Sequence, residues 1–223
     1  MGLFIAISVI LLWSGHLIYA LVFVAPDFTS PWMYLHVLIQ GYLFTGLFIT
    51  GHDAMHGTVS ENRTINQAIG WISTFLFAGL LYHKLIKNHG LHHQYSATER
   101  DPDFYIKSQN FFIWFAVFMY RYLTLWQILI MAGLYNLLLL WFDDPNLLIF
   151  WITPAILGTL QMFYFGVYAP HKLPHTDYMK PYNARTQKKN HLWAMLSCYF
   201  FGYHYEHHDS PRIPWWKLHK TKV

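Results

Sequence analysis

Apolar residues occur along this chain in long runs that are separated by short polar breaks. The runs without Asp, Glu, Lys or Arg are 1–26, 28–52, 64–83, 108–120, 122–142, 145–171 and 190–205. A helix needs about 20 mainly apolar residues to cross the roughly 30 Å of hydrocarbon in a bilayer. The first two runs therefore predict a hairpin of two spanning helices, broken near Pro26 and Pro31. The runs 122–142 and 145–171 predict a second hairpin, broken at residues 143–146.

Three five-residue stretches, which we call the histidine boxes, hold eight of the 15 histidines. They contain His52, His56, His89, His92, His93, His204, His207 and His208. Residues three and four apart lie on one face of a helix, so the histidines within each box are predicted to be neighbours. Imidazole is a good ligand for iron, copper, zinc and nickel. Because one tetrahedral zinc site takes only three or four ligands, eight histidines predict two metal ions.

A shared metal centre constrains the path of the chain through the membrane. If residues 64–83 crossed the bilayer, the first and second boxes would lie on opposite faces. We therefore predict an interfacial or re-entrant helix there, buried against the bundle. The second and third boxes need an even number of crossings between them, which the second hairpin supplies. The aromatic-rich stretches 108–120 and 190–203 are predicted to lie along the interface.

Composition and charge support a membrane protein. Only 12% of the residues are charged, whereas soluble domains carry about 25%. All 15 Lys and Arg residues fall within 63–121 or 172–222, so the positive-inside rule places the boxes and both termini in the cytoplasm. No Lys/Arg-rich run is interleaved with aromatics, which argues against nucleic acid as a partner. The prediction is one all-α domain over residues 1–223 in the cytoplasmic membrane, with about four transmembrane helices, interfacial helices and a cytoplasmic histidine-rich cap.

Further residues are candidates around the boxes. His171 follows Tyr168-Ala-Pro170 at the same predicted membrane face, and we expect it to be a ninth ligand. A ligating histidine usually donates its other ring N–H to a carboxylate or a carbonyl. Five carboxylates near the boxes are candidates for this role, with solvated surface charge as the alternative: Asp53, Asp101, Asp103, Glu206 and Asp209. Substrate-binding residues carry no recognisable signal.

An all-histidine site for two metals, without thiolates, is best suited to iron that activates O₂. The electrons must come from outside the chain, because it has no GxGxxG, no CxxCH and no set of Fe–S cysteines. Metal ligands at the cytoplasmic ends of membrane helices favour a substrate that lives in the bilayer.

The boxes and their neighbouring motifs resemble those of a known family. The three boxes are similar to those of the membrane-bound histidine-box di-iron superfamily of desaturases, hydroxylases and ketolases. Within it, residues 46–57, 89–104, 165–171 and 201–218 resemble motifs of bacterial and cyanobacterial β-carotene ketolases. Val167 and Ala169 stand where that family is expected to have Thr and Leu. The resemblance runs from about residue 32 to the end of the chain.

The resemblance implies a di-iron ketolase that oxidises C4 of β-ionone rings with O₂ and a ferredoxin-like electron donor. Two hydroxylations and loss of water would take β-carotene to echinenone and canthaxanthin, and zeaxanthin toward astaxanthin. The eight box histidines would bind iron, with His171 as a ninth ligand. Open alternatives are a carotenoid hydroxylase, a sterol-type oxidase or an acyl desaturase on the same site. A non-catalytic metal binder or transporter is a further alternative, although transport should place ionisable ligands within the spanning helices.

Overall fold

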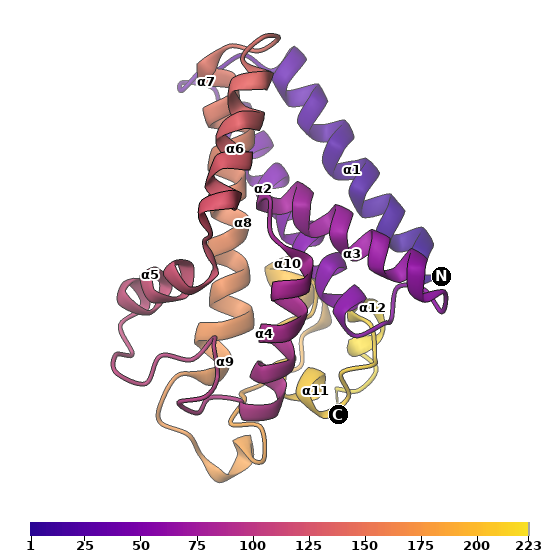
Figure 1. Ribbon diagram of the computed structural model, residues 1–223, viewed down its shortest axis with the longest axis vertical. Helices are drawn as coiled ribbons and strands as arrows, with labels where there is room; N and C mark the ends of the chain where they lie inside the picture. Colours follow the sequence, from indigo (N-terminus) through magenta and orange to yellow (C-terminus); the bar gives the residue numbers. More distant parts are fainter. Residues whose placement is uncertain (223) are drawn as a thin grey trace.

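The computed structural model describes residues 1–222, which contain helices and loops but no strand (Figure 1). Helices α1 (Gly2–Phe23) and α2 (Pro31–Met55) form the first predicted hairpin. Pro31 occupies the first position of α2, where its missing N–H costs no helical hydrogen bond. The two helices pack through Trp13 and Phe44, whose rings meet edge to face at 5.2 Å. This part of the sequence-based prediction is confirmed.

The third long apolar helix, which we call the long helix, runs from Asp144 to His171. It consists of α7 (Asp144–Leu147), η1 (Leu148–Ile152), α8 (Thr153–Phe163), η2 (Tyr164–Tyr168) and α9 (Ala169–His171). The η1 and η2 stretches are π-helical, and a proline follows within two residues of each. Just before Pro154 and Pro170, the N–H groups of Thr153 and Ala169 bond carbonyls five residues back. The wider turn accommodates a proline, which lacks the α-helical donor, so the helix continues to His171.

The predicted second hairpin paired the long helix with one helix over residues 122–142, and the structure differs there. Residues 122–142 do not form one helix, because a 90° bend separates α5 (Phe111–Tyr122) from α6 (Leu125–Leu138). The Thr124 side chain caps α6 by accepting from the Gln127 N–H, which fixes its start. The 14 residues of α6 rise only about 21 Å. Three helices are long and apolar enough to span: α1, α2 and 144–171. The number rises to five if each bent pair is one span, so four spans stay a prediction.

The run 64–83 is interrupted by the other sharp bend. Helix α3 (Arg63–Ala78) ends at Gly79, whose φ of +63° suits glycine, and α4 (Tyr82–Tyr95) leaves at 98°. In Figure 1, α3 lies across α2 and α4 runs down past its end. The second box on α4 thereby reaches the first box at the end of α2, as the shared site requires.

Short helices complete the histidine-bearing end of the molecule. They are η3 (Asp177–Met179), α10 (His191–Cys198), α11 (His204–Asp209) and α12 (Trp215–Leu218). The run 190–205 is not one helix, because Tyr199 and Phe200 adopt positive φ values and turn the chain. The Tyr199 ring stacks on Tyr42 of α2 at 4.4 Å, and Asp53 accepts from the Trp215 N–H. These contacts fix α11 and the third box beside the end of α2.

Candidate metal centre

Nine histidines from α2 and its C-cap, α4, α9 and α11 gather into two groups, each with ring nitrogens close enough to hold a metal ion. The five-histidine cluster consists of His52, His56, His89, His93 and His207. The four-histidine cluster consists of His92, His171, His204 and His208. Within each cluster, one nitrogen per residue lies within 4.8 Å of all the others. The expected ninth histidine, His171, therefore lies with the box histidines.

The division between the clusters corrects the expectation that each box presents one shared face. Within each box, the histidines four residues apart share a cluster, as His89 and His93 do. In each HxxHH box, however, the middle histidine joins the other cluster: His92 leaves the second box's pair, and His207 leaves the third box's pair. Adjacent helical residues point about 100° apart, so an HH dipeptide can serve two sites. The two HxxHH boxes thus exchange one histidine each.

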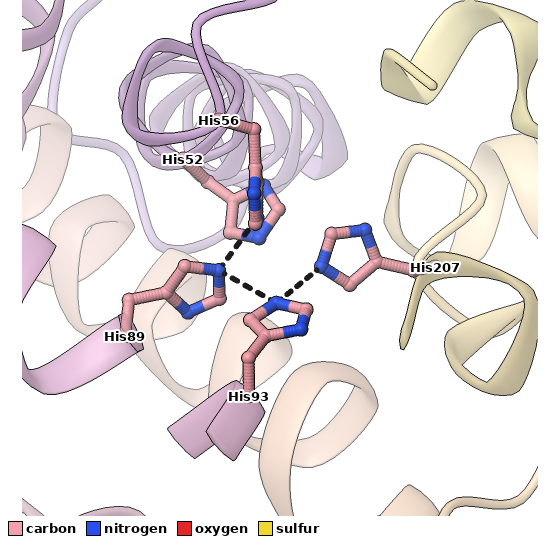
Figure 2. A group of neighbouring side chains, drawn as sticks. All are labelled: His52, His56, His89, His93 and His207. Carbon is pink, nitrogen blue, oxygen red and sulfur yellow. Dashed lines mark hydrogen bonds between the residues drawn. The ribbon is translucent and has the colours of Figure 1, made fainter. Parts of the chain in front are cut away.

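The five-histidine cluster is held by short contacts between ring nitrogens (Figure 2). The Nε2 atom of His89 lies 2.7 Å from Nε2 of His56 and 3.1 Å from Nε2 of His93. His93 Nε2 also lies 3.1 Å from His207 Nε2. His52 lies alongside with its ring centroid 4.5 Å from that of His89, and both of its nitrogens are buried without a partner.

Hydrogen bonding does not account for these contacts. A neutral imidazole nitrogen carries either one proton or one lone pair, so it serves one hydrogen bond well. The three Nε2 contacts in the five-histidine cluster need six such positions, but only four nitrogens are available. Lone pairs that converge on one cation remove this conflict. The residues therefore fit a bound metal, and the unpartnered nitrogens of His52 support the same conclusion.

The four-histidine cluster is fully buried and shows the same pattern. The Nε2 atom of His208 lies 3.1 Å from Nε2 of both His92 and His204. His171 is packed against both His92 and His204, at centroid distances of 4.9 Å and 4.8 Å, and its Nε2 is buried without a partner. This set also offers converging lone pairs to a cation.

A carboxylate pair fixes His92 from behind. Both oxygens of Asp101 lie 3.0–3.1 Å from His92 Nδ1, and Asp101 also accepts from the N–H groups of Ala97 and Asp103. Asp103 lies 3.7 Å from the same nitrogen and accepts from the Tyr122 hydroxyl. The Nε2 atom of His92 is thereby directed at the four-histidine cluster. Tyr122 was not anticipated, because its contact depends on the bend between α5 and α6.

The other three carboxylates behave differently. Asp53 lies 3.6 Å from His52 Nδ1, but its other oxygen accepts from the Trp215 N–H. Glu206 instead pairs with Lys222 and accepts from Thr186, and Asp209 accepts from Tyr182. Within residues 1–222, neither Glu206 nor Asp209 bonds a histidine. The expectation for these two is corrected, since helical rotation turns both side chains away from the cluster.

His171 is oriented by the backbone instead of a carboxylate. Its Nδ1 lies 3.1 Å from the carbonyl oxygen of Asn183. The Asn183 side chain donates to the carbonyl of Ser96 and so ties this loop to the end of α4. Every residue has a backbone carbonyl, so nothing in the sequence indicated that the carbonyl of Asn183 would orient His171. His175 joins neither cluster and contacts the carbonyl of His171 at 2.9 Å.

Burial sets the charge of the site. Burial, followed by the neighbouring imidazoles, holds the pKa of His204, His207 and His208 well below the usual value of 6.5. Burial raises the pKa of Asp103 to about 6. For Asp101 burial acts in the same direction, but the charge and hydrogen bonding of His92 bring its pKa below the usual range. The three histidines of the third box are therefore neutral at pH 7, which is the form that binds a metal.

Comparison with known proteins gives the class of this protein. The fatty acid desaturase family model matches residues 29–132 and 119–223. The chain therefore belongs to the fatty acid desaturase family.

Individual relatives narrow the comparison. The chain is 38% identical to the β-carotene ketolase of Paracoccus sp. (strain PC1), over 81% of this chain and 75% of that protein. It is also 38% identical to the zeaxanthin 4-ketolase of Chlamydomonas reinhardtii, over 99% of this chain and 53% of that protein. The chain thus spans about half the length of the algal relative. No solved structure matches.

Proposed function

We propose that this protein is a membrane-bound di-iron oxygenase that oxidises C4 of the β-ionone ring of carotenoids to a ketone. The observation that carries the proposal is the pair of all-histidine clusters that border one apolar cavity. The ketolase relatives support the choice of carotenoids as substrate. β-Carotene would give echinenone and canthaxanthin, and zeaxanthin would be converted toward astaxanthin.

The cavity joins both clusters to apolar surroundings. His52 and His89 line it from the five-histidine cluster, and His92 and His204 from the other. Phe48, Phe118, Met162 and Phe201 are among the apolar side chains that complete the wall. These apolar walls keep water away from a ring that lies against the histidines.

The five-histidine and four-histidine clusters would each hold one iron. Bound iron would activate O₂ with electrons from an external, ferredoxin-like donor. The chain supplies neutral imidazoles and holds His92 through Asp101 and His171 through the Asn183 carbonyl. For each hydroxylation, a C–H bond, O₂, two electrons and two protons give C–OH and one water. A second hydroxylation at C4 gives a gem-diol, which loses water to leave the ketone.

The orientation in the membrane is part of the proposal. Asn146 of the long helix donates to the Leu21 carbonyl at the end remote from the histidines, and the surrounding loops carry no Lys or Arg. All Lys and Arg residues lie within 63–121 or 172–222, the two segments that carry the second and third histidine boxes. By the positive-inside rule, this favours boxes and termini on the cytoplasmic side of the membrane. The electron donor would then approach from the cytoplasm.

Expression in cells that accumulate β-carotene tests the function. The expected result is echinenone and canthaxanthin, identified by chromatography and mass spectrometry, and no keto product from a His93→Ala variant. Hydroxylated carotenoids alone would replace the proposal with a hydroxylase, and new double bonds in lipids would replace it with a desaturase. Fewer than two irons per chain after reconstitution would contradict the dinuclear centre.

A further inference from the structure

The cavity at the histidine clusters borders a second cavity along the outside of the bundle. The outer cavity lies between α5, α6 and the long helix. Its rim includes Ile128 and Ile156, each 53% exposed. The two cavities share five lining residues, which we call the neck: Ala78, Met119, Leu123, Gln127 and Thr159. The outer cavity therefore leads from the lipid-facing surface toward the metal centre.

The long helix gives the extent of this path. The inner cavity reaches Val167 and the outer cavity reaches Ile152 on the same helix. Fifteen helical residues rise about 22 Å. The path thus suits a long rod-like molecule better than a compact one.

The neck lies where the two helical bends face each other. The Gln127 side chain at the start of α6 donates to the carbonyl of Ala78 at the end of α3, at 2.8 Å. On the α4 side, the Lys84 ammonium donates to the carbonyls of Arg121 and Tyr122 at the end of α5. Side-chain hydrogen bonds therefore join the two bends across the wall of the path.

Polar side chains of the neck and outer cavity are already engaged. Gln127 donates to Ala78, and the Thr159 hydroxyl donates to the carbonyl of Ala155 in its own helix. The Tyr135 hydroxyl, at the outer end, donates to Asp144. The remaining lining residues are apolar. No charged group lines the outer cavity to receive a lipid headgroup, which favours a hydrocarbon without one.

We propose that these cavities form one lateral channel, by which a long polyene without a headgroup enters from the bilayer and is held with its ring at the metal centre and its remaining length in the outer cavity. The neck residues determine what passes. This inference rests on the proposed function and deepens it by naming the entry route and the selecting residues.

A tryptophan in the neck tests the route. Thr159→Trp, compared with Gly133→Trp on the open side of α6, adds bulk within the channel in one case and outside it in the other. We expect Thr159→Trp to lower both the β-carotene that co-purifies per chain and the rate of keto-product formation at least about tenfold, because the indole occupies the neck and weakens binding of the polyene by about 1.4 kcal/mol. Iron per chain and the thermal midpoint should stay at the wild-type values. Gly133→Trp should match the wild type in every measurement.

A second variant covers the case in which Thr159→Trp loses iron or stability. Ala132 lines the outer cavity from the exposed rim, directly beside Gly133. Ala132→Trp should raise the KM for β-carotene several-fold but leave turnover of a short analogue with the same ring unchanged, because the short chain does not reach the outer cavity.

The outcomes separate the channel from the chemistry. If the wild type makes ketone and Thr159→Trp or Ala132→Trp binds β-carotene like the wild type, the channel is wrong. The channel would also be wrong if Ala132→Trp and Gly133→Trp lost β-carotene binding and keto-product formation to the same extent. If the wild type makes no ketone, the proposed function fails, while co-purified β-carotene that decreases only in the channel variants would still support the route.

Discussion

The two histidine clusters differ in exposure and in the support behind them. All four members of the four-histidine cluster are buried, whereas His56, His89 and His93 of the five-histidine cluster are partly exposed. In the four-histidine cluster, Asp101 holds His92 and the Asn183 carbonyl holds His171. In the five-histidine cluster, the nearest carboxylate is Asp53, which lies 3.6 Å from His52 and is bonded to Trp215.

This difference indicates two ways of building a metal site. The four-histidine cluster has few ligands, and their orientation is fixed by partners outside the cluster. The five-histidine cluster has one ligand more and less external support. Loss of a single ligand should therefore affect the two clusters unequally.

Removal of one histidine from each cluster gives the largest expected effect. His208→Ala leaves three histidines in its cluster, while His56→Ala leaves four in the other. We expect His208→Ala to retain about one iron per chain and to lose activity by more than the roughly 100-fold that loss of a supporting partner costs. His56→Ala should retain more iron, and elemental analysis of purified protein measures both. Equal iron loss in the two variants would contradict the unequal clusters.

Removal of the support behind His92 should have the next largest effect. Asp101→Asn keeps the shape of the side chain but weakens its hold on the ring nitrogen, so iron affinity should fall about 10–100-fold. Asp209→Asn is the matched control, because Asp209 is exposed and bonds Tyr182 and Ser210. Competition with a chelator of known affinity measures the change. A comparable loss in Asp209→Asn would restore the carboxylate role that the geometry denies it.

Acid should destabilise the metal-free protein. The pKa values of His204, His207 and His208 lie below 6.5 in the folded chain, so the unfolded chain binds more protons as the pH falls below 6.5. The free energy of unfolding should then decrease by up to about 1.4 kcal/mol per pH unit for each histidine. Thermal unfolding in detergent between pH 7.5 and 5.5 measures this. Bound iron should make the free energy of unfolding depend less on pH. If the stability of the metal-free protein does not change between pH 7.5 and 5.5, the histidines are not held neutral.

The limits of the sequence are clearest at the two bends. Hydrophobic runs predicted α1, α2 and the long helix, because each is an unbroken apolar segment. The same reasoning joined residues 122–142, although Thr124 and the 90° bend divide them. Hydropathy does not report a change of direction, since both arms of the bend are apolar. The neck of the proposed channel lies at these bends, so no residue could be assigned to it from the sequence.

The spacing of the box histidines and the distribution of charge were enough to predict which histidines gather, because both require one shared end of the molecule. The sequence also singled out His171 at the end of the long helix and Asp101 just after the second box. Two features depend on the folded arrangement of the helices: His92 and His207 join the cluster opposite to that of their box neighbours, and Asp101 contacts a histidine while Glu206 does not. The physical reason is rotation about the helix axis: adjacent side chains point about 100° apart. Their cluster therefore depends on how α4 and α11 face each other, which is set by contacts distant in the chain.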